Sequence, residues 1–202
     1  MAIIPEINRP QKAPARFLFL FVQCFTLAAI AIIFMALIRE LYYWIMVVAE
    51  VPAELIQSDD VWRMRYLGLR FDARTGTTLA IVPLLISLVL FYFKAAWKPL
   101  VRILTVWGAL AFFLVALLSV CNFHYIRTFH TAIDIFVFNF LHEEPQAVMT
   151  TVWQDYPIIS NSIAVIAVTV LMTWIWVKLF AWMSQSKFWD SLTAIKAIAL
   201  IV

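Results

Sequence analysis

Side chains that could do chemistry gather in one stretch of this sequence, "CNFHYIRTFHTAIDIFVFNFLHEEP", at residues 121–145. His130 and Asp134 stand four residues apart, so they can share one face of a helix. Zinc takes three or four protein ligands, and its helical signature is two histidines at this spacing. The stretch has no such pair. We therefore expect no metal site here and no catalytic residue.

Two interpretations of these polar residues stay open. In the first, they form a solvated face in which His130 hydrogen-bonds Asp134. In the second, Arg127, His124 and His130 form a face that contacts lipid headgroups or a partner domain. Arginine suits this second role because its planar guanidinium can bind a phosphate through two hydrogen bonds.

Apolar residues in the same stretch recur with a helical period. They are Ile126, Phe129, Ile133, Phe136 and Phe140. Because the opposite face is strongly polar, the pattern predicts an amphipathic helix that lies on the membrane surface rather than crossing it. Pro145 should end this helix and begin the next one, "PQAVMTTVWQDY".

A second candidate group precedes an apolar run. Arg70 and Arg74 are four residues apart and flank Asp72. They predict either interfacial anchoring with a local ion pair to Asp72, or binding of anionic lipid. Trp153, in the later "VWQDYP", is interpreted as part of an aromatic belt or as a contact to a lipid headgroup or a docked domain.

The elements that must position these residues are membrane helices. The chain has 202 residues, and 65% of them are hydrophobic, well above the share in a soluble domain. This composition predicts an all-α polytopic bundle. A cytoplasmic tail (1–16) precedes a membrane domain (17–202), with spans at about 17–38, 75–93, 101–121 and 158–183. An apolar run at 190–202 predicts the start of a fifth span.

Basic residues predict the orientation. Those in the N-terminal tail and in the short loop between the second and third spans should be cytoplasmic. The segments 39–74 and 122–157 then lie outside, although the first contains five arginines. Within it we expect a short helix from Ser58 to Tyr66 that stops at Gly68. The outer segments should therefore carry amphipathic interfacial helices.

Other functions find little support in the residues. The sequence shows no phosphate-binding glycine loop, nucleophile elbow or paired-carboxylate signature. The span centres lack the charged residues that mark transport pathways, which disfavours a channel or transporter. The net charge of +3 is too small to indicate nucleic-acid binding.

Three motifs resemble a known family. "GLRFDAR" (Gly68–Arg74) leads into one span, "NFHYIRTFHTAIDIFVFNFL" follows another, and "VWQDYP" (Val152–Pro157) precedes the last complete one. This order resembles the membrane portion of lipoteichoic acid synthase-like proteins, of the Gram-negative type within the alkaline-phosphatase/sulfatase superfamily. The resemblance covers roughly residues 66–157.

The resemblance implies a function that the residues alone do not. Members of the group carry five membrane helices and then an extracytoplasmic, metal-dependent domain. That domain transfers phosphoglycerol or a related phospho-alcohol from a phospholipid through a threonine nucleophile. This chain would be the anchor and lipid-presenting domain in a bacterial inner membrane, inactive alone. Its partners would be phospholipids and a catalytic domain beyond residue 202, where a divalent metal such as Mn or Zn would bind. The alternative is a non-enzymatic accessory subunit that docks a partner through its outer helices.

Overall fold

The fold is all-α, as the composition predicts. The computed structural model describes residues 10, 12–49, 51–52, 54, 56, 58–93, 97–129, 131, 133, 145–186 and 189. Helix α1 (Ala13–Tyr42) runs directly into a π-helical segment, η1 (Tyr43–Val48). The other helices are α2 (Ser58–Leu90), α3 (Trp97–Phe129), α4 (Pro145–Asp155) and α5 (Ile158–Ser184). No strand occurs within these ranges.

Among the described residues, four helices are long and apolar enough to cross a membrane. They are α1 with η1, α2, α3 and α5, and they contain the four predicted spans. They indicate a polytopic membrane protein. The predicted fifth span at 190–202 lies outside the described residues.

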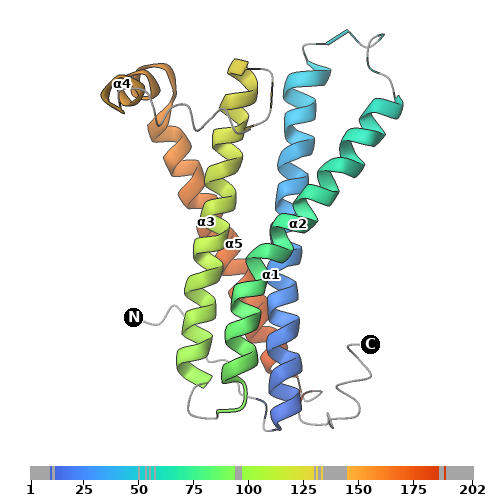
Figure 1. Ribbon diagram of the computed structural model, residues 1–202, viewed down its shortest axis with the longest axis vertical. Helices are drawn as coiled ribbons and strands as arrows, with labels where there is room; N and C mark the ends of the chain where they lie inside the picture. Colours follow the sequence, from blue (N-terminus) through green and yellow to red (C-terminus); the bar gives the residue numbers. More distant parts are fainter. Residues whose placement is uncertain are drawn as a thin grey trace.

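The long helices alternate in direction (Figure 1). The start of α1 and α3 and the finish of α2 and α5 lie at what we call the lower end, and η1 and α4 lie at the upper end. Helix α2 has 33 residues, about 50 Å at about 1.5 Å per residue, against about 30 Å of hydrocarbon. The long helices therefore project beyond the membrane core.

The length of α2 and α3 corrects two predictions about the outer segments. Gly68 does not stop a short helix, because α2 runs unbroken from Ser58 to Leu90. The predicted surface helix beginning near Ile126 is not separate either, since α3 continues through Phe129. Thr131 and Ile133, which the prediction placed in the same helix, are not helical, and its remaining part at 134–140 lies outside the described residues. The helix beginning at Pro145 is confirmed as α4.

Small residues let the helices approach in two pairs. Between α1 and α2, Ala28 packs with Ala80, and Gly76 lies against Ala28 and Ile32. Between α3 and α5, a Cβ at Gly108 would overlap the ring of Trp176. Close backbone approach at small residues is how helices associate in lipid, where apolar burial by itself gives little.

The core lies toward the lower end. It is built from Phe19 of α1, Leu100 and Phe112 of α3, and Trp176 and Phe180 of α5, all of them 2% exposed or less. The rings of Phe19 and Phe180 are 5.3 Å apart, in the range for aromatic pairs. The lower end is therefore closed by interdigitated side chains.

Arg16 also closes the lower end. It is 3% exposed, and its guanidinium donates hydrogen bonds to the carbonyls of Phe91 (2.9 Å) and Tyr92 (3.3 Å), just after α2 ends. A helix C-terminus leaves carbonyls unpaired and carries partial negative charge, so a cation there is stabilising.

Pro83 lies inside α2, and the carbonyl that it leaves without a helical partner makes a contact with α3. Proline has no N–H, so the carbonyl four residues earlier, on Leu79, lacks its helical partner. The indole N–H of Trp107 donates to that carbonyl at 2.9 Å. A backbone group that would otherwise be unsatisfied in lipid is thus paired by the neighbouring helix.

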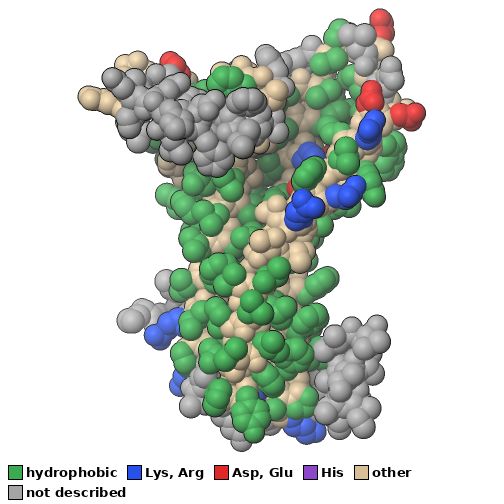
Figure 2. Space-filling model, viewed as in Figure 1, with side chains coloured by type: hydrophobic (Ala, Val, Ile, Leu, Met, Phe, Trp, Pro, Cys, Tyr) green, Lys and Arg blue, Asp and Glu red, His purple; other side chains and the backbone are tan. Residues whose placement is uncertain are grey.

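The surface fits a membrane environment (Figure 2). Hydrophobic side chains cover the middle of the molecule, and Lys and Arg side chains lie toward its lower end and over the upper part of α2. Large exposed aromatic side chains mark both ends, as in the belts that form at membrane interfaces. They include Trp44, Trp62, Tyr66 and Trp153 at the upper end and Tyr92, Phe93 and Trp182 at the lower end.

Candidate functional site at the upper end

Two ion pairs hold α2 against α1 at the upper end. Arg39 donates to Asp72 at 2.5 Å. Arg65 donates to both carboxylate oxygens of Glu40, at 2.9 and 2.7 Å. Gly68 makes room for the first pair, since a Cβ there would overlap the Arg39 guanidinium. Gly68 therefore does not end a helix but leaves space for the Arg39 side chain.

This arrangement corrects the predicted local ion pair of Asp72 with Arg70 or Arg74. Asp72 faces α1 and pairs with Arg39. Arg70 and Arg74 are exposed, and the structure shows no ion pair for either among the described residues. Arg70 lies over the ring of Tyr66, 5.8 Å from its centre. Both guanidinium groups thus keep donors free for an anion.

Arg63 extends this group. It is exposed on the same helix, and the positions 63, 70 and 74 follow the i, i+7, i+11 spacing of one helical face. We call Arg63, Arg70 and Arg74 the arginine stripe. Its last member directly precedes the predicted second span, which begins at Thr75.

The other predicted candidates among the described residues lie on α3 and α4. His124 is half-buried, shares a 2.8 Å hydrogen bond with Asn161, and packs on the ring of Tyr156 with centres 5.1 Å apart. The Tyr156 hydroxyl is in turn 3.2 Å from the Thr128 hydroxyl. Together these contacts join α3 to the start of α5. His124 therefore fastens two helices and does not project from a free polar face.

Arg127 and Trp153 are exposed, on α3 and α4 respectively. His130, and with it the predicted hydrogen bond to Asp134, lies outside the described residues. The structure thus places the predicted residues that it describes in two separate groups on different helices. Arg70 and Arg74 lie on α2, while His124, Arg127 and Trp153 lie on α3 and α4.

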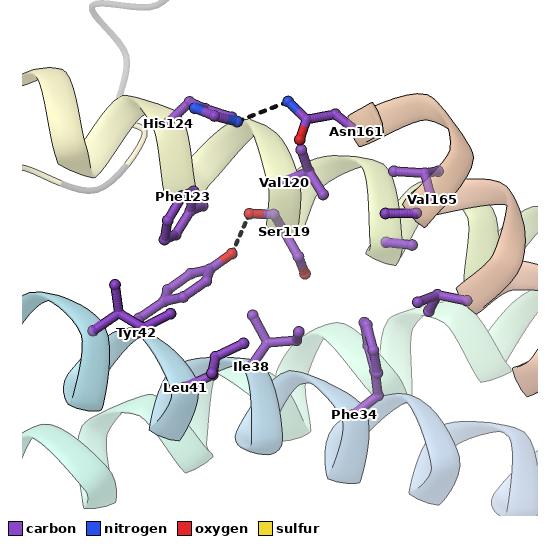
Figure 3. Close-up of a pocket in the computed structure, with 14 residues that line it drawn as sticks. Phe34, Ile38, Leu41, Tyr42, Ser119, Val120, Phe123, His124, Asn161 and Val165 are labelled. Carbon is purple, nitrogen blue, oxygen red and sulfur yellow. Dashed lines mark hydrogen bonds between the residues drawn. The ribbon is translucent and has the colours of Figure 1, made fainter. Parts of the chain in front are cut away.

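A cavity of about 240 Å³ opens between α1, α3 and α5, below the His124–Asn161 pair (Figure 3). Its polar groups face one another: the Tyr42 hydroxyl donates to the Ser119 carbonyl, and Asn161 meets His124. The rest of the lining is apolar. It includes Phe34, Ile38, Leu41, Ile45, Val120 and Val165.

The chemistry open to this end is binding. Within the described ranges, no group of three or more His, Cys, Asp or Glu side chains could hold a metal ion. Among the described residues, two features that could hold a ligand are the arginine stripe, which suits phosphate, and the apolar cavity, which suits hydrocarbon. Both occur on helices that project from the predicted spans.

Sequence reasoning missed several of these residues for identifiable reasons. The i, i+7 spacing of Arg63 with Arg70 was a usable signal. Arg39 and Asp72 are 33 residues apart in the chain, so their pairing depends on how α1 crosses α2. Tyr42 and Asn161 line the cavity only because three helices meet there.

Comparison of this chain with family models, with curated proteins and with solved structures gives no match. The class defined by the fold is a polytopic, all-helical membrane protein.

Proposed function

We propose that this chain is the membrane domain of a phosphoglycerol or related phospho-alcohol transferase of the lipoteichoic acid synthase-like group, and that it binds an anionic phospholipid at its upper end. The resemblance of "GLRFDAR" and "VWQDYP" supports the transferase assignment. The arginine stripe supports the lipid. The domain would anchor the enzyme and present lipid to it.

The observation that carries the lipid proposal is the stripe itself. Arg70 and Arg74 lack the acidic partner expected beside them because Asp72 is engaged by Arg39. Exposed arginines beside a membrane span attract anionic headgroups, at about 1 kcal/mol for each basic residue near the surface. Guanidinium groups also bind phosphate oxygens through paired hydrogen bonds.

The proposed setting is a bacterial inner membrane with the upper end outside. The lower end carries Arg16, Lys98 and Arg102, which would be cytoplasmic by the positive-inside rule. Catalysis would occur in an extracytoplasmic domain whose residues are not among these 202. The threonine nucleophile and the divalent metal implied by the resemblance would belong to that domain.

The test measures lipid selectivity of the purified protein. Phosphatidylglycerol and phosphatidylcholine would be offered together, and bound lipid counted by native mass spectrometry. Losing two basic residues removes about 2 kcal/mol, so Arg70→Ala with Arg74→Ala should lower the preference for phosphatidylglycerol about tenfold or more. Replacing both residues with lysine should keep most of it. An unchanged preference in the alanine variant would overturn the lipid proposal.

One observation favours the accessory-subunit alternative. Trp153 is 65% exposed on α4 at the upper end, and exposed tryptophan is typical of protein interfaces. A stoichiometric complex with an unrelated protein, lost in Trp153→Ala, would favour that function. Retention of anionic-lipid selectivity without such a partner would favour the transferase domain.

A further inference from the structure

The cavity between α1, α3 and α5 is separate from the arginine stripe, which lies on α2. We propose that this cavity holds one hydrocarbon chain of a membrane phospholipid, with the polar end of the lipid beside Tyr42, His124 and Asn161. The inference goes beyond the proposed headgroup site. It shares with that proposal only the premise that the upper end lies at a lipid leaflet.

Most of the cavity lining is apolar and offers no partner to a polar occupant. The Tyr42 hydroxyl already donates to Ser119, and Asn161 and His124 already meet each other. A buried water needs two to four polar partners, and the walls formed by Phe34, Ile38 and Val165 offer none. The cavity is therefore suited to an apolar group.

The entrance determines where that apolar group comes from. Leu41 of α1 and Ile45 of η1 are 49% and 44% exposed, and Ala164 of α5 is exposed as well. All three line the cavity and also face the surroundings of the bundle. In a membrane those surroundings are lipid, so the entrance would contact acyl chains. This commits the cavity to lipid rather than to a peptide from solution.

Position along the helices gives the direction of entry. Phe34 lies within the predicted first span, whereas Tyr42 follows it. On α5, Val168 is farther from the upper end than Asn161. The polar residues thus lie at the headgroup side and the apolar ones at the hydrocarbon side. A phospholipid chain inserted from the upper leaflet would match this gradient.

The size fits a chain segment. An apolar cavity of about 150 Å³ is enough to bind benzene, and this one is about 240 Å³. A space of this kind left empty would lose dispersion contacts along its walls. Filling by several methylene groups recovers them without any polar cost.

The experiment uses phosphatidylcholine whose acyl chain carries a photoreactive diazirine, in vesicles with the full chain. After irradiation, mass spectrometry would map adducts. We expect adducts at two residues that line the cavity, the half-buried Ile38 and the buried Val165, together with adducts at the exposed residues Ile166 and Val170 as an internal reference. Adducts confined to the lipid-facing residues would overturn the proposal.

A matched pair of variants sharpens the test. Ala164→Phe places a ring at the entrance, and Ala167→Phe adds the same ring at an exposed position of α5 outside the cavity. Cavity adducts should fall at least fivefold in Ala164→Phe and stay unchanged in Ala167→Phe. Ile45→Trp, at the other side of the entrance, should repeat the loss if Ala164→Phe fails to fold. Full cavity labelling in folded entrance variants would contradict the proposal.

The outcome is distinguishable from that of the headgroup test. Phosphatidylcholine has no net charge, so alanine at Arg70 and Arg74 should leave the cavity adducts unchanged. Loss of cavity adducts in that variant would show that the two sites are one, which contradicts the separate cavity site.

Discussion

The two ends of the helix bundle are stabilised in different ways. At the lower end, Phe19, Trp176 and Phe180 interdigitate, and Arg16 donates hydrogen bonds to two carbonyls just after the end of α2. At the upper end, contacts are made by ion pairs and single hydrogen bonds, and a cavity remains between three helices.

The difference fits the proposed function, in which the lower end anchors the protein and the upper end binds lipid. A closely packed core specifies one arrangement and leaves no space for a ligand. The upper end keeps space, free guanidinium groups and an entrance open to lipid. The same helices serve both ends because they are longer than the membrane core requires. Substitutions at the two ends should therefore have different consequences.

The largest expected effect is at the lower core. Phe180→Ala removes a side chain that is fully buried against Phe19 and Trp176. We expect the free energy of unfolding in detergent to fall by about 3–5 kcal/mol. The matched control is Phe25→Ala on α1, where the ring is 68% exposed and faces lipid; it should change stability by well under ~1 kcal/mol. Equal losses would remove the distinction between packed and lipid-facing positions.

The next effect compares two glycines. Gly108→Ala forces a Cβ into the Trp176 ring, which the core holds in place, whereas Gly68→Ala meets the flexible end of Arg39. We expect Gly108→Ala to cost about 1–3 kcal/mol of unfolding free energy and Gly68→Ala to cost less. Denaturation of both variants under the same conditions would show the order, and a reversed order would contradict this view of the packing.

A smaller effect concerns the contact between α2 and α3. Trp107→Phe removes the hydrogen bond to the Leu79 carbonyl and should cost about 1 kcal/mol. In a Pro83→Ala background, the new N–H can pair that carbonyl within α2, so the same tryptophan substitution should cost less. A double-mutant cycle measures this difference. Additive costs would show that the indole does not compensate for the proline.

Hydropathy was sufficient to predict the four spans, because a helix needs about 20 apolar residues to cross lipid. Apolar runs of that length are not typical of soluble proteins. Pro145 correctly predicted the start of α4. Local sequence signals gave a wrong prediction where a residue far away in the chain determines the structure. Gly68 reads as a helix stop in isolation, but α2 continues and the glycine accommodates Arg39.

The candidate site was predictable only in part. Arg70 and Arg74 were selected from their spacing, yet their freedom depends on Asp72 pairing with α1. His124 was selected as a contact residue, whereas the structure gives it Asn161 as a partner. The cavity has no sequence signature, since its walls come from three helices that are far apart in the chain.

In the proposed orientation, the open upper end faces outside and the packed lower end faces the cytoplasm. Labelling of single cysteines with a membrane-impermeant maleimide tests this orientation. The exposed Cys121 would first be replaced by alanine, and the buried Cys24 would be retained. Cysteine at Ser58 or Thr131 should react from outside intact cells, and cysteine at Lys98 should react only after the membrane is opened. Reaction of Lys98→Cys from outside, with Ser58→Cys protected until lysis, would contradict the account.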